Sequence, residues 1–169
     1  MNSLEEFNQC TLDEARASLT RCCGSQSWVD AMLSSRPWRD LDALYKAGEE
    51  LWGRMEREDI LEAFTHHPQI GADLDGLRKK FNTTAAWSGS EQASVMTASE
   101  DVLVALRDGN VAYQKKFGYI FIVCATGKSA SEMLSLLSDR LKHEPGAELM
   151  IAAGEQAKIT RLRLEKLLG

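Results

Sequence analysis

The sequence predicts an all-α protein of about eight or nine helices, organised as a single domain over residues 1–169. Three observations support this fold class. Patterns typical of helix starts recur along the chain, apolar residues repeat at helical spacing between them, and only three prolines interrupt the pattern. The strand-like residues 119–125 have no strand-like partner elsewhere in the sequence. We therefore expect an extended connection through the core at that point, with unpaired backbone groups available to a ligand. A buried helical segment is the alternative.

The first half of the chain predicts four helices. Thr11-Leu12-Asp13-Glu14 is a capping-box pattern that opens a helix towards Cys23, and Gly24 ends it. Further helices are expected over residues 27–34, 40–52 and 54–66. The last of these must stop at Pro68, because proline disfavours the α conformation of the residue before it.

The second half predicts four more helical segments. Ser88-Gly89-Ser90-Glu91 resembles a second capping box and should open a helix that runs to about Arg107. A short helix follows over residues 111–116. Ser129-Ala130-Ser131-Glu132 caps a helix over residues 133–142, and residues 147–168 form a terminal helix.

Composition excludes several functional classes. The net charge of −5 and the absence of any long basic run argue against nucleic-acid binding. Residues 119–125 form the longest strongly apolar run, which is too short to cross a membrane. The N-terminal residues lack the features of a signal peptide, and Leu167-Leu168-Gly169 is not a peroxisomal address. We therefore expect a cytoplasmic protein.

Cysteine and histidine spacings predict no metal site. Cys10, Cys22, Cys23 and Cys124 show no C-x-x-C spacing and are expected to be unreactive thiols in a reducing compartment. On a helix, the adjacent His66 and His67 would point about 100° apart and could not easily share one ion.

Motifs for phosphate binding and for nucleophilic serine catalysis also fail. Gly127-Lys128-Ser129 follows an apolar run, but Ile122 stands where a P-loop needs its first glycine. No serine lies in a G-x-S-x-G pattern. Acid–base chemistry remains as the class of reaction that the side chains could support.

His67 is the first candidate for that chemistry. At a helix-to-loop break before Pro68, it lies near the negative end of the helix dipole. The dipole favours the protonated imidazole, so His67 is expected to be a proton donor near neutral pH. The alternative is an ordinary helix cap without a chemical role.

Two other positions could bind a polar ligand. Ser88, Glu91 and Gln92 could simply cap a helix, or present side chains and backbone N–H groups to an anionic or amide-rich molecule. Arg163 falls within the apolar stripe of the terminal helix, whereas Arg161 is rotated about 200° away and should face solvent. A buried arginine needs an anionic or carbonyl partner, either a structural ion pair or a ligand carboxylate.

These residues belong to blocks that resemble the 2-oxo-4-hydroxy-4-carboxy-5-ureidoimidazoline (OHCU) decarboxylases of uric acid degradation. Together with Glu148-Leu149, the blocks cover the chain from about residue 55 to its end in the family's order. They are Glu62-x-Phe64-x-x-His67-Pro68-x-Ile70-Gly71, Ser88-x-x-Glu91-Gln92, Tyr113-x-x-Lys116-Phe117-Gly118-Tyr119-x-Phe121-Ile122-x-x-Ala125, and Lys158-Ile159-Thr160-x-Leu162-Arg163-Leu164.

The resemblance implies an all-helical, cofactor-free carbon–carbon lyase that is usually a homodimer. Its substrate would be OHCU, and its products carbon dioxide and (S)-allantoin. The family's catalytic residues fall on His67 and Glu91, and His66 receives no role. The substrate-binding positions fall on Pro68, Ser88, Gln92, Phe121, Ile122, Val123, Cys124, Ala125 and Arg163.

Two other functional classes stay open at this point. A non-catalytic helical interaction module would show an exposed apolar patch and a His-Pro break with no other functional group beside it. A hydrolase of cyclic amides would be favoured by a water-activating metal.

Overall fold

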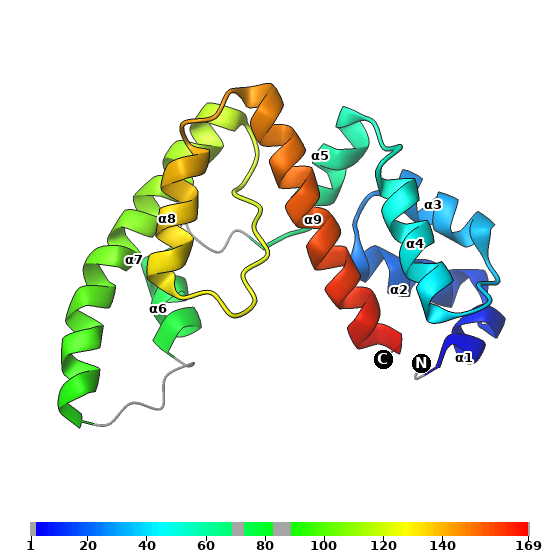
Figure 1. Ribbon diagram of the computed structural model, residues 1–169, viewed down its shortest axis with the longest axis horizontal. Helices are drawn as coiled ribbons and strands as arrows, with labels where there is room; N and C mark the ends of the chain where they lie inside the picture. Colours follow the sequence, from blue (N-terminus) through cyan, green and yellow to red (C-terminus); the bar gives the residue numbers. More distant parts are fainter. Residues whose placement is uncertain (1–2, 69–72, 83–88, 169) are drawn as a thin grey trace. The chain divides into compact units, whose positions relative to one another are not determined.

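The computed structural model describes residues 3–68, 73–82 and 89–168, with the side chains at 80, 82 and 89–99 outside the described part. In these residues the chain forms helices and no strand, which confirms the all-α class (Figure 1). The helices are α1 (Leu4–Gln9), α2 (Leu12–Cys22), α3 (Gln26–Ser35), α4 (Leu41–Trp52), α5 (Arg57–Thr65), α6 (Leu74–Asn82), α7 (Gly89–Phe117), α8 (Ala130–Arg140) and α9 (Pro145–Leu168).

The chain divides into two compact units. The first comprises residues 1–67 and 151–169 and contains α1 to α5 with most of α9. The second comprises residues 68–150 and contains α6, α7, α8 and the first residues of α9. No helix in the described ranges is long and apolar enough to span a membrane.

Helix starts follow the capping chemistry that the sequence predicts. The Thr11 hydroxyl accepts a hydrogen bond from the backbone N–H of Glu14, and the Glu14 carboxylate accepts one from the N–H of Thr11, which completes the capping box. Ser129 likewise accepts from the N–H of Glu132 and opens α8. Asp40 does the same for α4 through the N–H of Ala43.

Two tryptophans hold α4 in the core of the first unit. Trp28 of α3 is fully buried, and its indole N–H donates to the carbonyl of Gly48 over 3.0 Å. Trp52, at the end of α4, donates to the carbonyl of Ala153 in α9 over 2.9 Å. Each indole therefore buries a large apolar ring while satisfying its only polar group.

Helix α7 is longer than the sequence predicts. Residues 89–117 form one helix, whereas two helices separated near Gly109 and Asn110 were expected. The side-chain amide of Asn110 donates to the carbonyl of Leu106, four residues earlier, over 2.8 Å. A Cβ atom at Gly109 would lie 2.6 Å from Leu137 of α8, so glycine allows α8 to pack closely there. Packing against α8 thus overrides the weak helix propensity of these two residues.

Two short helices were not predicted. They are α1 and α6, which have 6 and 9 residues. Residues 119–125 form neither helix nor strand, which confirms the predicted connection and rules out the helical alternative. Tyr119 and Ile122 of this segment are buried in the second unit. Gly118 and Gly127 flank it with φ angles of +87° and +75°, values that favour glycine.

Candidate functional site

His67 lies at the helix-to-loop break where the sequence places it. The helical conformation of α5 ends at Thr65, and His66 forms its C-cap. The backbone N–H of His67 still donates to the carbonyl of Phe64 over 3.2 Å. The His66 side chain is exposed but packs closely on Gly24, where an added Cβ would lie 2.2 Å from its ring. The two histidines therefore face different surroundings.

A buried glutamine holds the His67 ring. Nε2 of His67 hydrogen-bonds Oε1 of Gln156, a fully buried residue of α9. The Gln156 amide nitrogen donates in turn to the hydroxyl of Thr160 over 3.0 Å. With the amide oriented this way, its oxygen accepts from His67, so the neutral imidazole carries its proton on Nε2.

The pKa of His67 is lower than its ordinary value. Burial is the main cause, and electrostatic interaction with Arg163 and His66 adds to it, while the hydrogen bond to Gln156 opposes the shift. The expectation of a protonated imidazole at the helix end is therefore wrong. Desolvation, together with the neighbouring Arg163 guanidinium, outweighs the effect expected of the helix dipole, so the neutral imidazole is favoured near neutral pH.

Arg163 lies on the same face of α9 as Gln156 and Thr160, because the three residues are spaced at i, i+4 and i+7. Its guanidinium donates to the carbonyl of Arg21 over 3.3 Å and has no carboxylate partner among the described residues. Its charge also acts on the imidazole, because it lowers the pKa of His67 electrostatically. An arginine in this position is free to bind an anionic group of a ligand.

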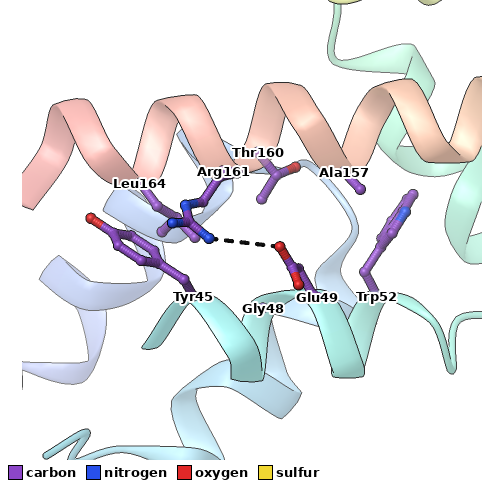
Figure 2. A pocket seen from close by; sticks show the side chains of 8 residues that line it. All are labelled: Tyr45, Gly48, Glu49, Trp52, Ala157, Thr160, Arg161 and Leu164. Atoms are coloured by element: carbon purple, nitrogen blue, oxygen red, sulfur yellow. Dashed lines mark ion pairs between the residues drawn. The ribbon is translucent and has the colours of Figure 1, made fainter. Parts of the chain in front are cut away.

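The predicted contrast between a buried Arg163 and a solvent-facing Arg161 is wrong. Both side chains are partly exposed. Arg161 lies over the ring of Tyr45, 3.9 Å from its centroid, and pairs with Glu49 (Figure 2). It also pairs with Glu165, four residues later in α9. Helix α9 packs against α4 on that side, so a residue outside the main apolar stripe still finds a protein surface.

A hollow between α4 and α9 is separate from His67. It is lined by Tyr45, Gly48, Glu49, Trp52, Ala157, Thr160, Arg161 and Leu164 (Figure 2). No predicted site residue lines this hollow. Glu49 and Arg161, which both line it, form an ion pair. The hollow therefore does not contribute the chemistry predicted for the site.

The two adjacent cysteines near Arg163 are poor nucleophiles. Cys22 and Cys23 are both buried, and burial raises the pKa of each thiol to about 11. Cys10 and Cys124 are partly exposed. Among the residues whose positions are described, no group of three histidine, cysteine or carboxylate side chains could hold a metal ion.

In the second unit, a buried ion pair anchors the segment predicted to bind substrate. Arg140 of α8 donates to the carbonyl of Ile122, and its guanidinium lies 4.6 Å from the ring centroid of Phe121. The same guanidinium pairs with the fully buried Glu148 over 2.6 Å. Glu148 also receives hydrogen bonds from Tyr113 and His143. The segment is thus tied to a satisfied polar network.

This network was not predicted, although the sequence contains a signal for it. Arg140 follows Met133 and Leu137 at i+7 and i+3, so it continues the buried stripe of α8. The same reasoning that singled out Arg163 would have singled out Arg140. For Gln156, the corresponding signal is its place on the face of α9 that also carries Arg163.

Backbone groups of residues 121–125 are less available than expected. The carbonyl of Ile122 accepts from Arg140, that of Cys124 from the Lys128 ammonium over 2.7 Å, and that of Ala125 from the Lys128 N–H over 3.1 Å. The expectation of unpaired groups is wrong for these three carbonyls. Phe121, Val123, Cys124 and Ala125 nevertheless keep partly exposed surfaces.

The remaining predicted site residues are Pro68, Ser88, Glu91 and Gln92. Pro68 is exposed and begins the second unit. Helix α7 begins at Gly89, in agreement with the predicted helix start. Glu91 and Gln92 lie in its first turn, but their side chains are outside the described part, and Ser88 lies outside the described residues altogether.

Comparisons with known proteins identify one protein family. The family described as OHCU decarboxylase matches residues 8–165. The uric acid degradation bifunctional protein TTL of Arabidopsis thaliana is 43% identical over 148 residues, which are 86% of this chain but only 45% of that protein. The 2-oxo-4-hydroxy-4-carboxy-5-ureidoimidazoline decarboxylase of Mus musculus is 33% identical, with 82% of this chain and 77% of the relative covered.

Two solved structures are similar to this chain, and one of them belongs to the same family. A crystal structure of OHCU decarboxylase in the presence of (S)-allantoin superposes with a TM-score of 0.68 at 38% identity, covering 88% of this chain and 94% of the other. A crystal structure of (S)-allantoin synthase has a TM-score of 0.72 at 17% identity and covers 98% of this chain and 54% of the other. The second likeness concerns the fold alone.

Proposed function

Because this chain belongs to the OHCU decarboxylase family, we propose that it decarboxylates OHCU stereospecifically to (S)-allantoin and carbon dioxide in urate breakdown. The similarity to a decarboxylase crystallised with (S)-allantoin supports this substrate and product. The observation that carries the proposal is the pairing of His67 with Gln156, beside an arginine that has no carboxylate partner among the described residues.

The reaction needs acid–base groups and an anion-binding group. Loss of carbon dioxide leaves the electron pair of the broken bond at C4, where it forms a C4=C5 double bond. The π pair of the C5=N imine moves to nitrogen, which takes up a proton. The C4 hydroxyl then loses its proton as C5 gains one, which gives the carbonyl of allantoin. The substrate provides its own electron sink, so we propose that no cofactor takes part.

The described side chains suit these steps. A partly buried, neutral His67 can accept the proton of the C4 hydroxyl and return it. The guanidinium of Arg163 can hold the carboxylate in the orientation that favours its loss. The structure thus supports the assignment of His67 and Arg163 through burial, hydrogen bonding and charge.

Other roles rest on the resemblance. We assign Glu91 as the acidic partner of His67, and Pro68, Ser88, Gln92 and residues 121–125 as substrate-binding positions. We also propose that the chain acts as a single domain, as a homodimer and in the cytoplasm. The match of the family over residues 8–165, which includes parts of both units, supports the first of these three proposals.

The stereochemistry of the product tests this function. OHCU is generated freshly from urate and allowed to react with and without the protein, and allantoin is followed by circular dichroism. A decarboxylase accelerates the reaction and gives the S enantiomer, whereas spontaneous decay gives a racemate. A non-catalytic interaction module leaves the time course and the racemate unchanged, and a cyclic-amide hydrolase gives a ring-opened product that retains the carboxylate. Either of these results contradicts the proposal.

A further inference from the structure

Gln156 gives His67 a fixed orientation. The glutamine is fully buried in α9, and its carboxamide contacts His67 on one side and Thr160 on the other. We propose that Gln156 is a positioning residue, which keeps the His67 proton on Nε2 and leaves Nδ1 as the nitrogen that exchanges protons with the substrate. This inference rests on the catalytic role proposed for His67.

The orientation of the carboxamide follows from its second contact. The Gln156 amide nitrogen donates to the Thr160 hydroxyl over 3.0 Å, and that hydroxyl also hydrogen-bonds the thiol of Cys23. Thr160 and Cys23 are both buried. Buried polar groups rarely remain without partners, so this chain of contacts limits rotation of the amide and directs its oxygen towards His67. An acceptor at that position requires a proton on Nε2.

The tautomer determines where a base can act. Neutral imidazole has one protonated and one basic nitrogen, and the hydrogen bond of one nitrogen selects the other. With Nε2–H donated to Gln156, the lone pair of His67 lies on Nδ1. When Nδ1 takes a proton from the substrate, the imidazolium keeps its Nε2 bond to Gln156, and the transfer back restores the same tautomer. No ring rotation is needed between the two steps.

Burial is the main reason why the imidazole is neutral before reaction, and electrostatic interaction with its neighbours adds to it. Arg163 from α9 and His66 from the end of α5 both disfavour a positive charge on His67. Cys23, from the connection between α2 and α3, is buried and interacts with Arg163 and Glu62. The carboxamide is uncharged, so it orients the ring without adding a countercharge. A carboxylate at the same position would instead favour the protonated imidazole of His67.

Nuclear magnetic resonance of the full chain tests the tautomer directly. Histidine is labelled with ¹⁵N and ¹³C, and the His67 signals are assigned by their loss in His67→Asn. Above the pKa of His67, we expect the Nε2–H tautomer in the wild-type protein. An Nδ1–H tautomer would overturn the proposal. Because this measurement uses the unaltered chain, it does not depend on whether a Gln156 variant folds.

Two substitutions test the effect on catalysis. Gln156→Glu preserves shape but places a carboxylate beside the imidazole, so the acidic limb of the kcat/KM profile should move upward by about one pH unit or more. Gln156→Met removes the acceptor, and kcat should fall by about tenfold to a hundredfold, part of what acid–base catalysis supplies, with little change in KM. Unchanged profile and kcat in the folded variants would contradict the proposal.

Gln26→Glu is the matched control. Gln26 also lies in the first unit, but its side chain contacts Arg16 and Thr20 rather than His67. It should leave the pH profile in place. If His67→Asn remains fully active, the proposed catalytic role of His67 fails. If His67→Asn is inactive while the wild-type tautomer is Nδ1–H, only the role of Gln156 fails.

Discussion

His66 and His67 are adjacent in the sequence but differ in chemical setting. His66 is exposed and packs on Gly24, whereas His67 is partly buried and bonded to Gln156. A helix end rotates successive side chains by about 100°, so neighbouring residues reach different surroundings. This separation explains how the His67 ring is held in a partly buried site next to an exposed histidine, and it supports the assignment of no role to His66.

At the same scale, the two arginines of α9 should differ in function. Arg163→Lys keeps the positive charge beside His67 but loses the planar fork that binds a carboxylate at two points. We expect KM for OHCU to rise by about tenfold, measured by steady-state kinetics. Arg161→Lys is the matched control, because Arg161 engages Tyr45 and Glu165. Equal losses in the two variants would argue against carboxylate binding by Arg163.

Two glycines in long helices distinguish the effect of close helix packing on stability from the effect of helix propensity. Gly109→Ala in α7 would bring a Cβ atom to 2.6 Å from Leu137, and we expect it to destabilise the fold by about 1–3 kcal/mol. Gly154→Ala in α9 meets nothing within 4 Å, so it should stabilise by about 0.5–1 kcal/mol. Urea unfolding measures both changes. A stabilising Gly109→Ala would show that α8 does not require this close approach.

The buried ion pair between α8 and α9 makes stability depend on pH. Burial opposes ionisation of Glu148, but hydrogen bonds from Arg140, Tyr113 and His143 prevail and hold its pKa below the ordinary value of 4.5. A carboxylate whose pKa is lower in the folded state contributes stability above the unfolded pKa. That contribution is lost as the pH falls through the folded pKa.

Glu148→Gln should therefore destabilise the protein most at neutral pH. Removing one partner of a buried ion pair leaves Arg140 uncompensated, and such losses are typically about 3–5 kcal/mol. Urea unfolding at pH 7 and again below pH 4.5 compares the variant with the wild type. The difference in unfolding free energy should shrink in acid. A difference that is independent of pH would contradict the ion-pair explanation.

Across the whole chain, local signals predicted structure best. The capping box at Thr11 and the helix stop before Pro68 depend on residues within a few positions, and both are confirmed. His67 and Gln156 are 89 positions apart, so their bond depends on tertiary packing that no local pattern reveals. The lowered pKa of His67 was missed for the same reason, since its cause is burial. Helix propensity also failed at Gly109, where packing prevails.

Family membership and the geometry of the site both support acid–base catalysis by His67 on OHCU. The most direct test compares His67→Asn with the matched control His66→Asn, using freshly generated substrate and circular dichroism of the allantoin produced. We predict that His67→Asn stays folded and loses about 10²- to 10⁴-fold in rate, while His66→Asn retains activity and S selectivity. A His67→Asn protein with wild-type rate and stereoselectivity would contradict it.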